Sequence, residues 1–213
     1  LISGKLSLLT SFAIKYVECK LEPCIYQFID LRLSQEKLWR NLSETKRQAI
    51  SKNPLSIRYK TISGLQVSDE IISGFKECHM KASGRKTRPD STWNVIKKMI
   101  QENAGFLIQA LDGQNAIGYY FFTTELSCCT YAISASDRSY HAVTDLTAKA
   151  LWEAILIAKS RGYLWFDCSE TNYSYQKNEM TEDKKKKHNI SLYKHSFGCQ
   201  EIGFFTVKLS GAS

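Results

Sequence analysis

The chain has 213 residues, of which 43% are hydrophobic and 23% are charged, and this balance excludes a disordered or fibrous protein. The formal net charge is +8, and residues 40–98 account for all of it, with 13 Lys and Arg against 5 Asp and Glu. A basic region this concentrated indicates an anionic partner such as CoA, a phosphorylated ligand or RNA, and a solvated surface is the alternative.

The N-terminal residues 1–26 are apolar and strand-like but contain no recognisable motif. Within them, the apolar stretch 6–17 is interrupted by Ser7, Thr10, Ser11 and Lys15. A transmembrane helix needs about 20 apolar residues in succession. We therefore expect no membrane span here.

The next part of the chain reads as three helices and a short strand. Ser34, Ser68 and Asp90 each precede a segment with apolar residues at helical spacing and are suitable N-caps. Pro54 ends the first of these segments. The predicted elements are helices over residues 34–53, 68–84 and 91–103, and a strand over 57–61.

From residue 105 the periodicity changes to that of strands. Asp112-Gly113 lies between two apolar runs and is a strong hairpin signal. A long amphipathic segment then ends at Gly162, a residue favoured just beyond a helix. The predicted elements are strands over 105–111, 116–123, 130–135, 163–168 and 204–209, a helix over 144–161, and an apolar-aromatic segment over 190–197. The lysine run 184–187 is expected to be a mobile loop.

This order predicts an α/β fold with a mixed sheet. A meander of strands is followed by a helix and a buried strand, which favours a mostly antiparallel central sheet with helices on its faces. We expect one such domain over residues 27–213.

The seven cysteines do not suggest a disulfide framework. Their number is odd, no CxxC pair occurs, and no His–Cys cluster has zinc spacing. The adjacent pair Cys128 and Cys129 fits ordinary packing, because free cysteine behaves as a small buried hydrophobe. A reducing cytoplasm is the expected location, without a bound metal.

Four stretches of the sequence form a distinctive pattern: Leu38 to Ile50, His79 with Gly84 to Trp93, Tyr131 to Asp167, and Ile190 to Gly198. In their order and spacing they resemble the FemAB-like transferases and the related BioF2-like acetyltransferase domains of the GNAT superfamily. The resemblance covers residues 27–208, and the order of the predicted elements is also that of a GNAT domain. It implies an N-acyltransferase or aminoacyltransferase, with acyl-CoA or aminoacyl-tRNA as the donor substrate and no permanently bound cofactor.

One departure from the superfamily pattern concerns the donor. Many acetyl-CoA enzymes of this superfamily carry a glycine-rich turn before the long helix, where backbone amides grip the pyrophosphate. Here the corresponding residues, 136–143, contain no glycine. In full FemAB enzymes two such domains pack together, so residues 1–26 are interpreted as the remnant of a preceding domain. A second GNAT-like domain or a homodimer is accordingly an expected partner.

Candidate catalytic residues follow from the resemblance. Lys194 matches the family lysine near the reacting centre, where a cation could stabilise an oxyanion or a phosphate. Its neighbour Tyr193 could line the acceptor site or belong to the core. His79 could act as a general base or be structural. Asp167 ends a buried strand and could be catalytic or accept a structural hydrogen bond.

Candidate binding residues are the cations near the second stretch. Arg85 and Arg88 lie in a loop bounded by glycine and proline and could hold an anionic group or order the loop. Arg138 could replace the absent glycines as an anion contact. Trp93 could stack on a ligand or pack in the core.

Two function classes therefore remain. The first is a transferase that moves an acyl or aminoacyl group from an anionic donor such as CoA or tRNA to an amine. The second is a non-catalytic GNAT-like module that binds a phosphorylated ligand or RNA through its basic N-terminal half. An RNA-binding module is less well supported, because no RRM or KH signature occurs.

Overall fold

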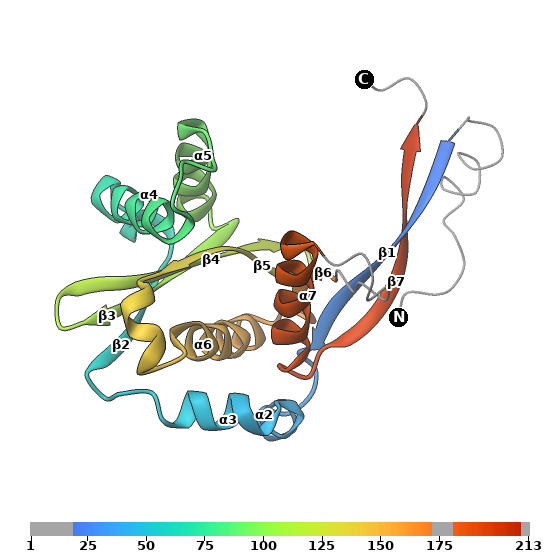
Figure 1. The fold of residues 1–213 in the computed structure, drawn as a ribbon, viewed down its shortest axis with the longest axis horizontal. Coiled ribbons are helices and arrows are strands. Elements are labelled where there is room, and N and C mark those ends of the chain that lie inside the picture. Colours follow the sequence, from blue (N-terminus) through green and yellow to red (C-terminus); the bar gives the residue numbers. More distant parts are fainter. Residues whose placement is uncertain (1–18, 172–180, 210–213) are drawn as a thin grey trace.

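The computed structural model describes residues 19–171 and 181–209, which form a seven-stranded sheet with helices on both faces (Figure 1). The strand order is β2-β3-β4-β5-β6-β1-β7. The strands are β1 (Cys19–Asp30), β2 (Ile57–Ile62), β3 (Gly105–Asp112), β4 (Asn115–Glu125), β5 (Cys128–Ser136), β6 (Trp165–Glu170) and β7 (Gln200–Leu209). The helices are α2 (Gln35–Asn41), α3 (Glu44–Ser51), α4 (Asp69–Ser83), α5 (Asp90–Gln101), α6 (Leu146–Ser160) and α7 (Glu182–His195).

The predicted α/β fold with a mixed sheet is confirmed. The sheet is not antiparallel throughout, because β5 and β6 run parallel to each other. This parallel pair follows from the chain path: β5 leads into α6, which crosses one face of the sheet and returns the chain to β6 in the same direction.

Strand β1 belongs to this sheet rather than to a separate segment. It pairs with β6 on one side and, from Cys19 to Phe28, with β7 on the other. The predicted domain boundary between residues 26 and 27 therefore falls inside a strand. The remaining N-terminal residues, 1–18, lie outside the described residues, so their interpretation as a domain remnant stays a prediction.

Two helix predictions need correction. The single helix expected over 34–53 is two helices, because Leu42 leaves the helical conformation and Ser43 caps a new helix by accepting a hydrogen bond from the Lys46 amide. The third helix begins at Asp90 itself, preceded by Pro89 as its N-cap residue. The predicted caps Ser34 and Ser68 are confirmed by hydrogen bonds to backbone amides.

The loop expected around the lysine run is wrong, since these residues lie in α7. The Thr181 side chain accepts a hydrogen bond from the Lys184 amide and caps the helix. Glu182 and Asp183 occupy the first turn, where carboxylates interact favourably with the helix dipole. Asp183 also pairs with Lys187 one turn later at 2.8 Å. Local capping and charge order therefore stabilise a helix despite its low hydrophobicity.

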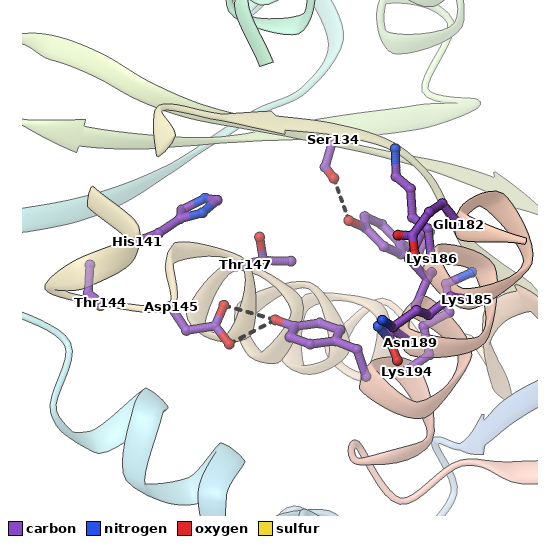
Figure 2. Close-up of a pocket in the computed structure, with 13 residues that line it drawn as sticks. Ser134, His141, Thr144, Asp145, Thr147, Glu182, Lys185, Lys186, Asn189 and Lys194 are labelled. Carbon is purple, nitrogen blue, oxygen red and sulfur yellow. Dashed lines mark hydrogen bonds between the residues drawn. The ribbon is translucent and has the colours of Figure 1, made fainter. Parts of the chain in front are cut away.

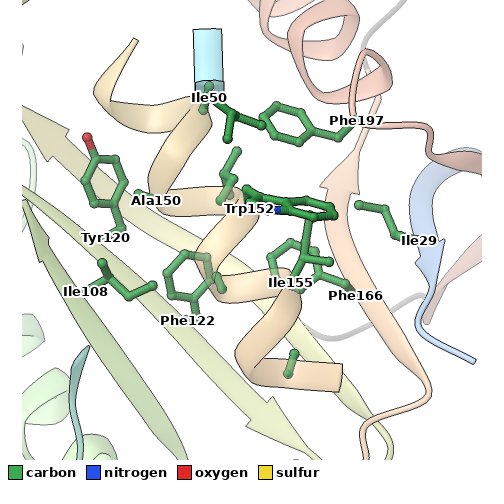
Figure 3. Packing of buried hydrophobic residues seen from close by; sticks show 14 of the residues in the cluster. Ile29, Ile50, Ile108, Tyr120, Phe122, Ala150, Trp152, Ile155, Phe166 and Phe197 are labelled. Carbon is green, nitrogen blue, oxygen red and sulfur yellow. The ribbon is translucent and has the colours of Figure 1, made fainter. Parts of the chain in front are cut away.

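The two faces of the sheet are covered by different helices. On one face α2, α3, α6 and α7 pack over the side chains of β3 to β6, where Phe122 lies between Phe106 and Phe166 (Figure 3). Trp152 of α6 meets Trp39 of α2 with ring centroids 5.2 Å apart. On the other face α4 and α5 cover the β2–β5 half of the sheet.

Candidate functional site

The parallel strands β5 and β6 stay paired over only three residues each. Cys128, Cys129 and Thr130 pair with Trp165, Phe166 and Asp167. Immediately afterwards the β4–β5 register shifts, because Ala132 is an extra residue opposite Phe121 and Phe122. An extra residue of this kind bends a strand away from its neighbour. The two strands therefore separate just beyond Thr130 and Asp167.

A cavity of about 780 Å³ lies beside this separation (Figure 2). Its walls come from β5, from the start of α6 and from one side of α7. The lining residues are Tyr131, Ser134, His141, Thr144, Asp145, Thr147, Glu182, Lys185, Lys186, Asn189, Ile190, Tyr193 and Lys194. Three lysines against two carboxylates make its lining basic.

Lys194 faces this cavity from the last turn of α7. The side chain is partly buried, and burial lowers the pKa of its ammonium group, although nearby Cys168 and Asp167 oppose that change. The Cys199 thiol donates to the Lys194 carbonyl at 3.2 Å and ties the end of α7 to the start of β7. The backbone at Lys194 is thus anchored, and its side chain places a cation at the cavity.

Tyr193 belongs to a buried polar network at the cavity wall. Its hydroxyl donates to the Asp145 carboxylate, at 2.9 Å from Oδ1 and 3.1 Å from Oδ2 (Figure 2). The Lys46 ammonium pairs with the same carboxylate at 2.8 Å and lies 3.5 Å from the centre of the Tyr193 ring. Burial and the Asp145 charge raise the pKa of Tyr193 well above its ordinary value. Tyr193 therefore remains a neutral phenol with a fixed orientation.

Lys46 and Asp145 are not among the site residues predicted from the sequence. Asp145 is also the N-cap of α6 and accepts a hydrogen bond from the Ala148 amide at 3.0 Å. Its position before a long amphipathic helix was a usable capping signal. No local signal links it to Lys46, which lies 99 residues earlier in the chain.

A hydroxyl pair lines the β5 wall of the cavity. The Tyr131 hydroxyl is hydrogen bonded to Ser134 Oγ (Figure 2). Burial raises the pKa of Tyr131 to about 12. This wall thus presents neutral hydroxyls, in contrast to the lysines of α7.

Asp167 is the last residue of β6 that pairs with β5. Burial raises the pKa of its carboxyl, while the Ser169 amide and the Lys194 charge act in the opposite direction. The Ser169 amide donates to Oδ1 at 2.6 Å. The structure thus brings Asp167, Tyr193 and Lys194 to the same part of the sheet.

The other predicted residues lie on the opposite face, with α4 and α5. Trp93 is only 4% exposed and packs against the rings of Phe75 and His79, at 5.2 and 5.5 Å between centroids. Burial and the Arg88 charge lower the pKa of His79. Arg85 is exposed in the loop after α4. These positions are separated by the sheet from Lys194.

Arg138 lies in the connection that the superfamily pattern fills with glycines. Residues Arg138–Ala142 form a short 3-10 helix before α6, and the Arg138 guanidinium donates to the Ala82 carbonyl at the end of α4. It lines a second cavity, of about 400 Å³, between α4 and β5. The structure therefore places Arg138 with α4 rather than with Lys194. The roles predicted for Arg138, His79, Arg85, Arg88 and Trp93 stay predictions.

Two further properties apply to the residues that the structure describes. No helix among them is long and apolar enough to cross a bilayer. Within the same ranges, no group of three His, Cys, Asp or Glu side chains is arranged to hold a metal ion.

The comparisons with known proteins identify the fold. No family model and no curated protein matches this sequence. Among solved structures, FemX matches with a TM-score of 0.66 and 10% identity, over 86% of this chain and 61% of that one. L-PGS from Bacillus licheniformis matches with a TM-score of 0.64 and 8% identity, over 95% of this chain and 65% of that one. A tandem GNAT protein from the clavulanic acid biosynthesis pathway matches with a TM-score of 0.51 and 16% identity, over 100% of this chain and 62% of that one.

Proposed function

We propose that this chain is a transferase that moves an acyl or aminoacyl group from acyl-CoA or aminoacyl-tRNA to an amine. The GNAT-like fold, of the kind found in FemX, supports this proposal and agrees with the resemblance to FemAB-like domains. The chain spans 61% to 65% of the length of FemX, L-PGS and the tandem GNAT protein. The observation that carries the proposal is Lys194, a partly buried cation held at a basic cavity where β5 and β6 separate.

The chemistry of the reaction explains why such a cation is useful. The amine nitrogen attacks the acyl carbonyl carbon, and negative charge develops on the carbonyl oxygen. The bond from that carbon to the donor's sulfur or oxygen then breaks, and the amine loses a proton. A fixed ammonium group stabilises the developing oxyanion, and removal of one such donor typically reduces the rate about 10²- to 10³-fold.

The basic lining also suits an anionic donor. Lys185 and Lys186 line the cavity from α7, as Lys194 does. Ammonium groups bind phosphate oxygens as point charges. We propose that these lysines hold the phosphate groups of CoA or of a tRNA end. Because both donors occur inside cells, the proposal also favours the cytoplasm.

A transfer assay with labelled acetyl-CoA, a long-chain acyl-CoA and aminoacyl-tRNA tests this function. Each donor is first screened by thermal unfolding, since a ligand present at 100 times its Kd stabilises the folded state by about 2.7 kcal/mol. The Lys194→Met variant is expected to lose transfer about 10²- to 10³-fold. The matched control is Lys98→Met, which removes a lysine with a side chain 73% exposed.

The outcomes separate the two function classes. Transfer that depends on Lys194 supports the proposal. Binding of a donor or of RNA without any transfer would overturn it in favour of a non-catalytic module. The non-catalytic module would bind its anionic ligand through the basic N-terminal half. Several cations of that half are already in ion pairs, since Lys76 and Lys86 pair with Asp90 and Lys97 pairs with Asp69, which gives the module little support.

A further inference from the structure

A third cavity lies on the outer strands of the sheet and shares no lining residue with the basic cavity. Its volume is about 290 Å³, and it is formed by the β1–β7 pair together with one residue of β6. The lining residues are Cys24, Tyr26, Phe28, Asp167, Phe204 and Phe205. Figure 1 shows that β1 and β7 extend beyond the helices that cover the rest of the sheet. This aromatic pocket is therefore open on a part of the sheet that no described helix covers.

Strand alternation explains why aromatic rings and a carboxylate meet there. Ile29, Phe166 and Cys168 point into the core under α6. Their neighbours Phe28 and Asp167 must then point to the opposite face, because successive side chains of a strand alternate. Asp167 is paired directly with Phe28 across the β1–β6 ladder. The pocket is thus formed by side chains that the pairing of three adjacent strands, β6, β1 and β7, brings to one face of the sheet.

The rings form a compact cluster. Tyr26 and Phe204 meet edge to face with centroids 5.5 Å apart, and Phe28 lies 6.0 Å from Phe204. Aromatic faces attract cations through their quadrupole, most strongly where water is partly excluded. The same row of rings already binds a cation at its other end, where the Arg32 guanidinium lies 4.7 Å from the Trp165 ring centre.

The charge around the pocket is negative. Asp167 lines it, and Glu170 is paired with Tyr26 across the β1–β6 ladder. After burial, Glu170 has the largest effect in raising the pKa of Tyr26, and Asp167 adds to it. The nearest described cation of the transfer site is Lys194, which faces the other cavity from α7. An anion would be repelled here, whereas an ammonium group would meet the Asp167 carboxylate and the aromatic rings, with the Glu170 charge nearby.

We propose that this aromatic pocket binds a primary alkylammonium group and is the site of the acceptor amine. The inference rests on the proposed function for the word acceptor, and the binding itself needs only the geometry above. The acceptor class is accordingly an aliphatic primary amine. Asp167, at the last paired residue before β5 and β6 separate, then lies between the amine pocket and the basic cavity.

The test is binding of n-butylammonium to the full chain, measured by two-dimensional NMR and isothermal titration without any donor. Butanol and butyrate are the neutral and anionic probes of the same length. We expect butylammonium to shift the amide signals of β1 and β6, and butanol and butyrate to bind at least about tenfold more weakly. Equal binding of butylammonium and butanol would overturn the inference.

Variants locate the site. Asp167→Asn is expected to weaken butylammonium binding about tenfold, and Tyr26→Leu about threefold. Glu125→Gln is the control, because it removes one carboxylate at the exposed far end of β4. Unchanged affinity in both pocket variants would refute the proposal, and should Asp167→Asn fail to fold, Tyr26→Leu and the NMR shifts still decide it.

Failure of the acceptor site and failure of the transferase are distinguishable. A chain that transfers acyl groups but does not bind butylammonium on β1 and β6 refutes the pocket and leaves the function standing. A chain that binds butylammonium there but transfers nothing from any donor supports the pocket as an ammonium site and refutes the transferase.

Discussion

Replacement of Lys46 by Met tests the polar network that orients Tyr193. The Lys46 side chain is 10% exposed and its partner Asp145 is 30% exposed, so the ion pair is largely removed from water. Met retains the apolar stem of lysine, and the substitution therefore removes the charge with little loss of packing volume.

The expected magnitude follows from the contacts that are lost. A hydrogen bond to a charged group contributes about 1.5–3 kcal/mol, and a cation over an aromatic face adds about 1 kcal/mol. Asp145 keeps its hydrogen bonds to Tyr193 and the Ala148 amide and remains accessible to water, which moderates the cost. We therefore expect Lys46→Met to lower the free energy of unfolding by about 3 kcal/mol.

Denaturant unfolding at constant pH measures this difference, with Lys98→Met as the matched control. Lys98 pairs with Glu102 at 3.7 Å and both side chains are more than half exposed, so its loss should change stability by less than about 0.5 kcal/mol. Tyr193→Phe in both backgrounds completes a double-mutant cycle, for which we expect a coupling of about 1 kcal/mol between residues that share Asp145. A loss below about 1 kcal/mol for Lys46→Met, together with zero coupling, would refute the network.

Three other substitutions give independent checks by the same unfolding measurement. Gly198→Ala should cost about 2–4 kcal/mol, because φ is +79° and a Cβ would lie 2.6 Å from the Asn41 carbonyl oxygen; a loss below about 1 kcal/mol would contradict this contact. Asp167→Asn should raise the free energy of unfolding, relative to the wild-type protein, by more at pH 7 than at pH 3.5. The raised pKa of Asp167 means that the wild-type protein loses stability as pH rises through that pKa, whereas Asn does not titrate. A variant-minus-wild-type difference that is the same at both pH values would refute the shift. Tyr120→Phe should change the stability by less than about 1 kcal/mol, because the buried hydroxyl makes no hydrogen bond of normal geometry among the described residues, although Thr147 and Ser136 lie near enough to interact with it; a loss above about 2 kcal/mol would show a strong hydrogen bond there.

Local signals in the sequence were enough to predict most of the fold. Serine caps, the Asp112-Gly113 hairpin and the glycine after α6 place element ends to within a few residues. The helix break at Leu42 was not predicted, because apolar residues continue at helical spacing across it. The one local signal for a new helix is the capping residue Ser43. For the lysine run the charge density suggested a loop, but the capping residues before it decided the outcome.

The candidate site was predictable only where a resemblance supplied it. Lys194 and Gly198 belong to one such stretch, and the structure explains the glycine through its positive φ and its close approach to Asn41. Lys46 and Asp145 come together from α3 and α6 through the packing of helices on the sheet. No periodicity in a single chain encodes a contact between side chains that far apart.

The basic cavity is built from a part of the chain that charge counting did not single out. All of the net charge lies in residues 40–98, yet none of the residues that line the cavity beside Lys194 comes from that region. Its lysines come from α7, within the part of the chain that is neutral overall, and Asp167 and Glu170 of the same part lie by the aromatic pocket. Opposite charges of this neutral part thus lie at two different cavities. A transferase that joins an anionic donor to a cationic amine needs this separation, because a uniformly basic surface would repel the acceptor.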